Sequence, residues 1–435
     1  MGDHNWGSTR ALGRAVLLVG TLVLAGVLLG RLDLVAVAAP FALGTAWALR
    51  RRPTAAPAVT VAIAAEVATE GGQVDGTVGV ANPDPVGFDL VVVRVEHSPW
   101  LRLRRADRPY ATALPGLQTT VVGFSGPALR WGQHEVGPAR AYAVAADGLL
   151  LSALAEAPAA SVRIHPLTMP FRADETMPRA TGLIGSHRSR RPGVGGELAG
   201  VRRYGPGDRL RRIDWRVTLR TRELHVAQTL SDRDAEVVVL LDALHEAGQS
   251  GGVHGTASVL DTSVRAAAAI AEHYLQQGDR VGLIEYSGHP RHLRSASGRR
   301  QYHTILEWLL ATRAMPGSSD RPVFAIDPHL IPNSALVVVL TPLLSAESTE
   351  MIARLAQAGR FVVALDTLGR TGERKVVGSQ WTSLAQRLWW LERENTIDAL
   401  REAGVPVVAW AGTGSLDHVL HDLNRMAAAP RIGLR

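Results

Sequence analysis

The chain has 435 residues, of which 46% are hydrophobic and 20% charged, and its net charge is +7 at pH 7. This length and composition suffice for two or three domains with buried cores, and they exclude a disordered or collagen-like chain. The absence of cysteine excludes thiolate nucleophiles, disulfides, iron–sulfur clusters and cysteine-ligated zinc. The modest charge, without basic runs interleaved with aromatic residues, argues against nucleic-acid binding.

A single lysine, Lys375, lies between Arg374 and Val376. A Walker A loop needs a Gly-Lys-Ser/Thr tripeptide, because the lysine ammonium must reach the β- and γ-phosphates of the nucleotide. The chain contains no such tripeptide. We therefore predict that it is not a P-loop ATPase.

The N-terminal region carries two apolar runs, residues 15–30 and 34–49, separated by a short polar break. We predict a membrane anchor over residues 1–52, made of two transmembrane helices that contact the lipid bilayer through residues 15–49. Arginines precede the first run and follow the second, and this bias predicts that the N-terminus and the soluble domains lie in the cytoplasm, at the cytoplasmic membrane. The alternative is a secretory signal peptide cleaved after Val37-Ala38-Ala39, which leaves the second run unexplained.

Residues 53–165 contain short apolar runs separated by turn-forming residues, which is typical of a small all-β sandwich. We expect strands at residues 59–68, 73–80, 89–97, 118–124 and 140–146. No catalytic cluster is visible in this region. The pattern favours a structural or protein-binding module.

Residues 166–232 lack a clear amphipathic period and are rich in arginine, glycine, aspartate and tryptophan. We single out one set of residues with fixed spacing: Arg202, Tyr204, Gly207, Asp208, Arg211, Asp214, Trp215 and Arg220. The spacing of Ile213 and Trp215 suits one buried face of a strand. Two interpretations of the charged residues stay open, a structural ion-pair network between domains and a ligand-binding site.

Residues 233–435 alternate apolar, strand-like runs with helical patterns, which predicts an α/β domain with a mostly parallel sheet covered on both faces. The expected strands are 237–241, 281–285, 336–340, 361–365 and 405–410, and the expected helices are 263–277, 302–311, 347–358 and 383–403. Ligands of such sheets bind beyond the carboxyl ends of the strands, so Asp242 and Thr341 should lie at that rim.

The spaced residues of the 166–232 segment resemble the signature of the bacterial family called domain of unknown function fifty-eight. The resemblance extends to the order of parts: a two-helix anchor, a β domain, the signature and a C-terminal domain similar to von Willebrand A domains. It implies that the chain works with a MoxR-type AAA+ ATPase. In the proteins that work with these ATPases, A-like domains act as adaptors in the assembly or maturation of other proteins. The resemblance does not specify the client protein.

In von Willebrand A domains the rim carries Asp-x-Ser-x-Ser, which holds Mg²⁺ together with a threonine and a second aspartate. Here the corresponding residues are Asp242-Ala243-Leu244-His245-Glu246, and Pro342 stands where the second aspartate is expected. Because Leu244 has no oxygen for a hard cation, we expect no metal. We also expect no other cofactor. We retain Asp242, Glu246 and Thr341 as rim interaction candidates; a degraded Mg²⁺ site is the alternative.

Three hypotheses for function follow. The leading one is a membrane-anchored, cytosol-facing scaffold or adaptor that binds other proteins. We find neither an HExxH motif nor a Gly-x-Ser-x-Gly elbow, so the sequence gives no argument for an enzyme of either type. The second is an enzyme that acts on a phosphate-bearing or cell-wall precursor through the arginines and aspartates of the signature. In the third, the signature has a purely structural role.

Overall fold

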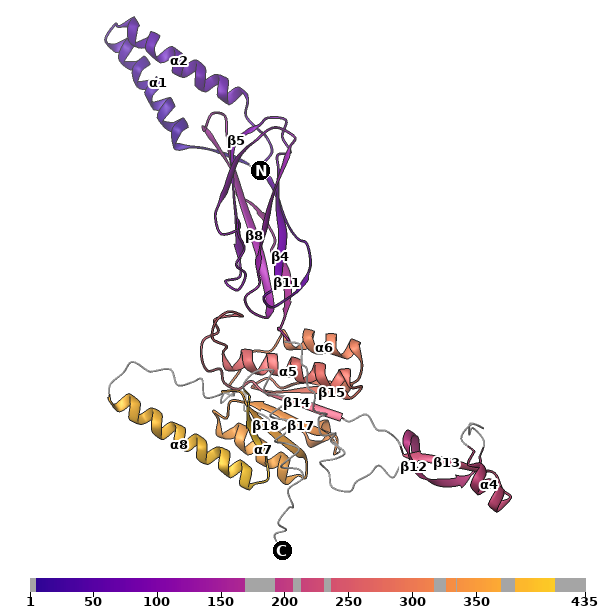
Figure 1. Cartoon of the computed structure of the whole chain (residues 1–435). Coiled ribbons are helices and arrows are strands. Elements are labelled where there is room, and N and C mark those ends of the chain that lie inside the picture. The colour runs from indigo at the N-terminus through magenta and orange to yellow at the C-terminus, as the bar shows by residue number, and fades with distance from the viewer. Residues whose placement is uncertain are drawn as a thin grey trace. The chain divides into compact units, whose positions relative to one another are not determined.

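A computed structural model describes residues 5–168, 192–205, 213–230, 236–316, 326–333, 335–368 and 380–410. The chain divides into two compact units (Figure 1). The first comprises Met1–Leu167 with Gly251–Gly255, and the second comprises Thr168–Ser250 with Thr256–Arg435.

The first unit begins with a short strand, β1 (Trp6–Ser8), and two antiparallel helices, α1 (Arg10–Leu28) and α2 (Leu32–Arg50). Thr9 caps α1, since its hydroxyl accepts a hydrogen bond from the Leu12 N–H at 3.4 Å. The turn uses Gly30, whose φ of 65° is a backbone conformation that favours glycine. At Gly26, a Cβ atom would lie 2.7 Å from Val35 Cγ2, so glycine permits the close approach of the two helices.

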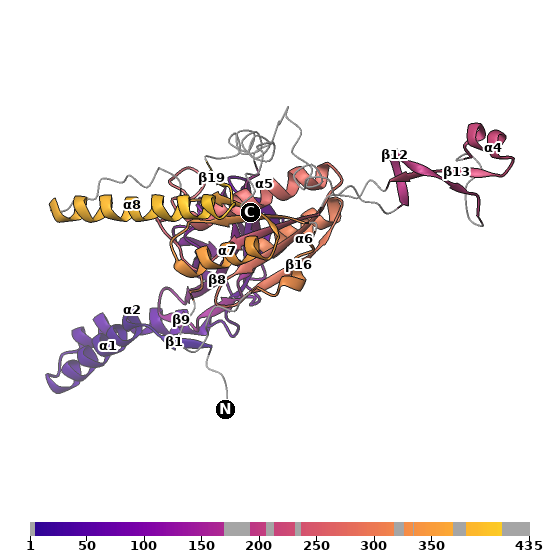
Figure 2. The same ribbon diagram turned by 90° about the horizontal axis from the view of Figure 1, so that it is seen from below.

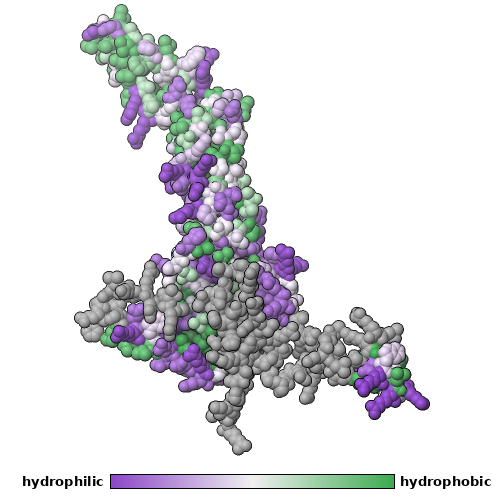
Figure 3. All heavy atoms as spheres, in the orientation of Figure 1, coloured by the Kyte–Doolittle hydropathy of each residue, from purple (hydrophilic) through white to green (hydrophobic). Residues whose placement is uncertain are grey.

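This helical hairpin confirms the two predicted apolar helices. Each has 19 residues, with a mean hydropathy of 2.1 for α1 and 1.7 for α2, and only 6% and 11% of their apolar windows are buried. Leu17, Leu28 and Leu29 are each at least two-thirds exposed, and apolar residues cover much of the hairpin surface in Figure 3. Both helices are thus long and apolar enough to cross a bilayer.

The rest of the first unit is a β-sandwich-like region of two sheets. The smaller sheet has the order β2-β4-β7, and the larger one has the path β1-β9-β8-β11-β3, with β10 and β5 also paired to β8, and β6 paired to β5. The strands are β2 (Ala58–Ile63), β3 (Val67–Thr69), β4 (Gln73–Ala81), β5 (Phe88–His97), β6 (Tyr110–Leu114), β7 (Thr119–Pro127), β8 (Gly132–Ala145), β9 (Leu150–Ser152), β10 (Ala155–Ala157) and β11 (Ala160–His165). Alternate residues of β4 are buried, as expected for a strand with one face on a core.

Every strand predicted between residues 53 and 165 is found, although the first one divides into β2 and β3. The hairpin is tied to this region at both of its ends. Before α1, β1 pairs with β9 and the Trp6 ring packs on Phe88 with centroids 5.5 Å apart. After α2, the Ala55 carbonyl accepts a hydrogen bond from Trp6 Nε1 at 3.2 Å.

The second unit contains an arm and an α/β sheet. The arm consists of β12 (Pro192–Arg203), α4 (Trp215–Thr221) and β13 (His225–Leu230), and its two strands form an antiparallel pair. The prediction that Ile213 and Trp215 share a buried strand face is wrong. Ile213 is buried and bridges to Val226, but Trp215 is the first residue of a helix and is 62% exposed.

The α/β sheet has the order β16-β15-β14-β17-β18-β19, and all its pairs are parallel except β15 with β16. Its strands are β14 (Glu236–Asp242), β15 (Arg280–Tyr286), β16 (Arg291–Ala296), β17 (Leu336–Thr341), β18 (Phe361–Asp366) and β19 (Val407–Ala409). The mostly parallel sheet and its five predicted strands are confirmed. Strand β16 was not predicted.

Helices cover both faces of this sheet (Figure 1). α5 (Val259–Gln276) and α6 (Arg299–Leu309) lie on one face, and α7 (Ala346–Gln357) and α8 (Gln380–Glu402) lie on the other; a short 3-10 helix spans Pro328–Leu330. All four predicted helices are present. Between α7 and the sheet, Met351, Ile352 and Leu355 are buried against Val337 and Val339 in one apolar cluster.

Candidate functional site

The carboxyl end of the parallel sheet brings Asp242 and Thr341 together, as predicted. Parallel pairing sets Leu241 of β14 beside Leu340 of β17, so the residues that follow are neighbours although they are 99 positions apart. The Thr341 hydroxyl donates a hydrogen bond of 2.6 Å to Asp242 Oδ2, and the Leu244 N–H donates one of 3.3 Å to Oδ1. Asp242 is 3% exposed and Thr341 is fully buried.

Burial raises the pKa of the Asp242 carboxyl above its ordinary value of 3.8. Hydrogen bonds from the side chains of Thr341 and Ser348 and from the Leu244 backbone, together with the charge interaction with His245, act in the opposite direction but do not outweigh desolvation. The hydrogen-bond donors are neutral, so they compensate a buried negative charge less fully than a hydrogen-bonded cation would.

We expect the Asp242→Asn variant to be more stable than the parent. The difference in their free energies of unfolding should grow as pH rises above about 4. Between the ordinary and the raised pKa, the folded parent holds a proton that the unfolded chain releases, so its stability falls with rising pH, by up to about 1.4 kcal/mol per pH unit. Asparagine does not ionise. Urea denaturation of the full chain in detergent micelles, at about pH 5 and about pH 8, measures the difference. The exposed Asp398→Asn is the control, and a difference that is equal at both pH values contradicts the prediction.

The residues at this rim do not fit a Mg²⁺ site. Thr341 Oγ1 already donates to Asp242 and accepts from the Leu343 N–H at 3.0 Å. Leu244 is buried and apolar, and Glu246 is exposed rather than enclosed with Asp242. Within the described residues no group of three or more His, Asp or Glu side chains is arranged to hold a metal.

A second buried acid at the same rim was not predicted. Asp366, the last residue of β18, pairs with Arg393 of α8, whose side chain is 3% exposed. Arg393 also donates to the carbonyls of Pro342 and Leu343. Asp366, like Asp242, is an aspartate at the end of an apolar strand, and this pattern could have identified it. The sequence does not indicate that Arg393 is the partner of Asp366.

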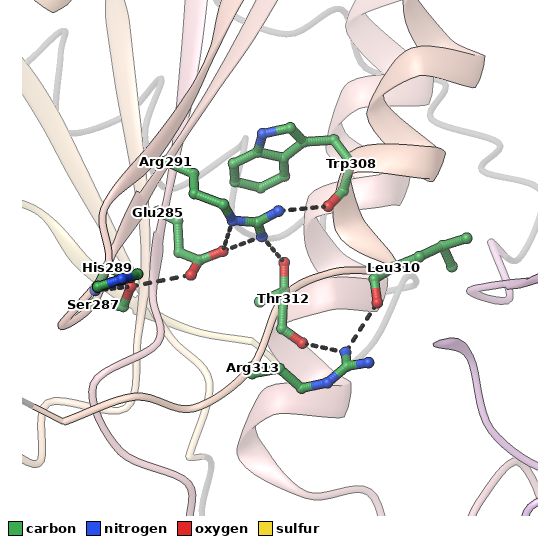
Figure 4. Close-up of polar contacts among 8 residues, drawn as sticks. All are labelled: Glu285, Ser287, His289, Arg291, Trp308, Leu310, Thr312 and Arg313. Carbon is green, nitrogen blue, oxygen red and sulfur yellow. Dashed lines mark hydrogen bonds and ion pairs between the residues drawn. The ribbon is translucent and has the colours of Figure 1, made fainter. Parts of the chain in front are cut away.

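A third cluster lies at the edge of the sheet (Figure 4). The carboxylate of Glu285, 3% exposed, accepts from the guanidinium of Arg291 and from the Ser287 hydroxyl at 3.0 Å. Arg291 also donates to the Trp308 carbonyl at 3.3 Å and to the Thr312 hydroxyl at 3.1 Å. Its guanidinium carbon lies 4.2 Å from the centre of the Trp308 ring. The cluster joins β15, β16 and the end of α6.

The structure describes five of the eight signature residues, whereas Gly207, Asp208 and Arg211 lie outside the described residues. Asp214 is the N-cap of α4, because its Oδ1 accepts from the N–H groups of Arg216 at 3.1 Å and Val217 at 3.2 Å. The Tyr204 N–H donates to the Leu224 carbonyl at 2.8 Å, which links the residue after β12 to the residue before β13. The local role of Asp214 is therefore to start a helix.

The arm presents apolar and cationic side chains together. Trp215 is 62% exposed and Leu219, one helical turn later, is 78% exposed. Arg216 and Arg220 of the same helix are exposed as well. We call these four residues the α4 patch. Beside it, Arg203 pairs with Glu223 at 2.9 Å, and Arg202 is exposed.

A helical hairpin that can cross a bilayer, a β-sandwich-like region and a mostly parallel α/β sheet define a multidomain protein. Residues 200–378 form a domain of the family described as protein of unknown function DUF58. The uncharacterized proteins Rv1480 of Mycobacterium tuberculosis and Mb1516 of Mycobacterium bovis are each 31% identical over 216 residues, which is 48% of this chain. The chain spans 65% of the length of these relatives.

Two solved structures are each similar to about a quarter of the chain. The CARDB domain of the PF1109 protein from Pyrococcus furiosus is 16% identical, with a TM-score of 0.19, and the match covers 26% of this chain and 93% of that domain. A cohesin module of a family 33 glycoside hydrolase from Clostridium perfringens is 12% identical, with a TM-score of 0.20, over 26% of this chain and 98% of the module.

Proposed function

We propose that this chain is a membrane-anchored, cytosol-facing adaptor that recruits a MoxR-type AAA+ ATPase for the assembly or maturation of other proteins. The observation that carries the proposal is the α4 patch, which presents the signature tryptophan to solvent. Tryptophan and arginine are the residue types most enriched at the energetic centres of protein interfaces. An exposed tryptophan on a capped helix suits a docking surface better than a purely structural role.

The hairpin supports membrane attachment. Its helices of 19 residues are about 28 Å long, close to the thickness of the hydrocarbon core. Arg10 and Arg14 lie at the start of α1, and Arg50, Arg51 and Arg52 lie at the end of α2. Because antiparallel helices bring these two ends to the same side, the positive-inside rule favours a cytoplasmic location for the parts of the chain that follow the hairpin.

The satisfied rim supports a binding role rather than catalysis by the α/β domain. Both carboxylate oxygens of Asp242 and the Thr341 hydroxyl are hydrogen-bonded to neighbouring groups of the same domain, and Asp366 is paired with Arg393. An A-like domain of this kind can contact a protein partner through its surface without a metal. The resemblance of the signature to MoxR-associated proteins supports the ATPase as that partner.

The alternative enzyme hypothesis receives less support from the described signature residues. Asp214 is engaged in helix capping, and Arg203, next to the signature, pairs with Glu223. We therefore keep the adaptor as the conclusion.

We expect Trp215→Ala to weaken capture of the ATPase by roughly 10- to 100-fold, because truncation of a central interface tryptophan has that effect. The experiment isolates the tagged full chain from cross-linked membranes and quantifies a co-purified MoxR-type ATPase by mass spectrometry. Leu154→Ala, which alters a leucine that is 59% exposed in the β region, is the matched control. Absence of the ATPase from the parent preparation overturns the proposal, and equal capture by Trp215→Ala excludes the α4 patch as its site.

A further inference from the structure

Helix α8 packs on its domain with one face and exposes apolar side chains on the opposite face. On one face Leu400 is buried and Arg393 is held by Asp366, so the C-terminal half of the helix packs on the domain. On the opposite face three leucines of the N-terminal half are exposed: Leu384 by 48%, Leu388 by 55% and Leu391 by 56%. Figures 1 and 2 show this half of α8 extending beyond the sheet.

The exposed leucines follow a coiled-coil spacing. Leu384, Leu388, Leu391 and the exposed Asn395 are separated by four, three and four residues, which alternates the d and a positions of a heptad. Leucine then occupies both d positions, and the two a positions carry Leu388 and Asn395. We call these four residues the α8 seam. A single face of this pattern fits another helix of the same kind.

We propose that the α8 seam pairs with the α8 seam of a second copy of this chain, as a short parallel two-stranded coiled coil. In this register each residue of the seam meets its own equivalent. The two Asn395 side chains face each other and can hydrogen-bond, and a single asparagine at an a position is a known determinant of register and of the two-stranded state.

Charges beside the seam fit the same register. Arg387 occupies a g position and Glu392, five residues later, occupies the following e position; both are exposed. In a parallel pair, each g residue faces the e residue of the next heptad in the other helix. Arg387 of each copy therefore meets Glu392 of the other, and the two-fold symmetry produces this pair twice.

The antiparallel arrangement is less favourable. To oppose Leu388 with Leu391, it sets Asn395 of one copy against Leu384 of the other, which buries an amide without a partner. The parallel arrangement avoids this cost. Each helix is already held on its own domain through Arg393 and Leu400, so pairing does not require the helix to fold first. Two heptads suit a weak and reversible dimer.

Cysteine cross-linking of the full chain in detergent micelles tests the proposal, because the parent has no cysteine. In the parallel pair Leu384→Cys places two thiols across the seam, close enough for a disulfide on oxidation. In the antiparallel pair the two positions are about 16 Å apart along the axis and cannot form one. Glu394→Cys, an exposed position beside the seam, is the control for random collision.

We expect Leu384→Cys to give a disulfide-linked dimer well above the yield of Glu394→Cys. In the Leu384→Cys background, Arg387→Glu should reduce the yield by about tenfold, because both pairs become repulsive, and addition of Glu392→Arg should restore it. Equal yields from the two cysteine variants overturn the proposal. Failure of the charge exchange to restore the yield overturns the parallel register.

Discussion

Replacement of Arg393 by methionine should lower the free energy of unfolding of the α/β domain by about 3–5 kcal/mol. Methionine fills a similar volume but leaves the Asp366 carboxylate, whose side chain is 12% exposed, without its cation. It also leaves the Pro342 and Leu343 carbonyls without their donor. Urea denaturation of the full chain in detergent micelles measures the loss, and hydrogen exchange of β18 and α8 locates it.

Two further variants separate the ion pair from general damage to α8. Arg401→Met removes an exposed cation of the same helix, 55% exposed and paired with the exposed Asp398, and should cost less than about 1 kcal/mol. Asp366→Asn, added to Arg393→Met, removes the stranded charge and should recover part of the stability. A loss from Arg393→Met as small as that from Arg401→Met would refute the role of the buried pair.

The second large effect is expected at the edge of the sheet. Arg291→Met should destabilise the domain by about 2–4 kcal/mol, because Glu285 remains buried with the Ser287 hydroxyl as its donor. We place this below the Arg393 effect, since the Arg291 side chain is 31% exposed and water can partly replace it. The variant also loses the contact of the guanidinium with the Trp308 ring.

Thermal and urea unfolding of the full chain, followed by Trp fluorescence, measure this effect. Arg294→Met changes an exposed arginine of the same strand and should alter stability by no more than about 0.5 kcal/mol. Glu285→Gln in the Arg291→Met background should recover stability, because a neutral amide replaces the unpaired carboxylate. If the double variant is less stable than Arg291→Met alone, the unpaired charge is not the cause of the loss.

The pair of Arg393 and Asp366 also bears on the inferred dimer. It fixes the C-terminal half of α8 on the domain and thereby directs the opposite face, with Leu388 and Leu391, away from the core. A variant that releases Arg393 should therefore weaken both the domain and the cross-link at Leu384→Cys. The charge exchange between Arg387 and Glu392 separates these effects, since both residues are exposed and neither contributes to the core.

The sequence by itself determined the features that depend on near neighbours. Apolar runs long enough to cross a bilayer predict α1 and α2, and alternating strand and helix patterns predict the parallel sheet, because both signals repeat within a few residues. The spaced signature suffices to recognise the DUF58 domain. Because parallel strands share one carboxyl edge, the sequence alone also predicts that Asp242 and Thr341 lie together.

Only the tertiary structure decided which charges pair and which side chains are exposed. The chain holds 47 Lys and Arg residues and 40 Asp and Glu residues, so composition cannot select Arg393 for Asp366 or Arg291 for Glu285. Trp215 was expected on a buried strand face, yet Asp214 caps a helix there and the tryptophan is exposed. Ion pairing and burial depend on distances between segments remote in sequence, and those distances exist only once the strands and helices have packed.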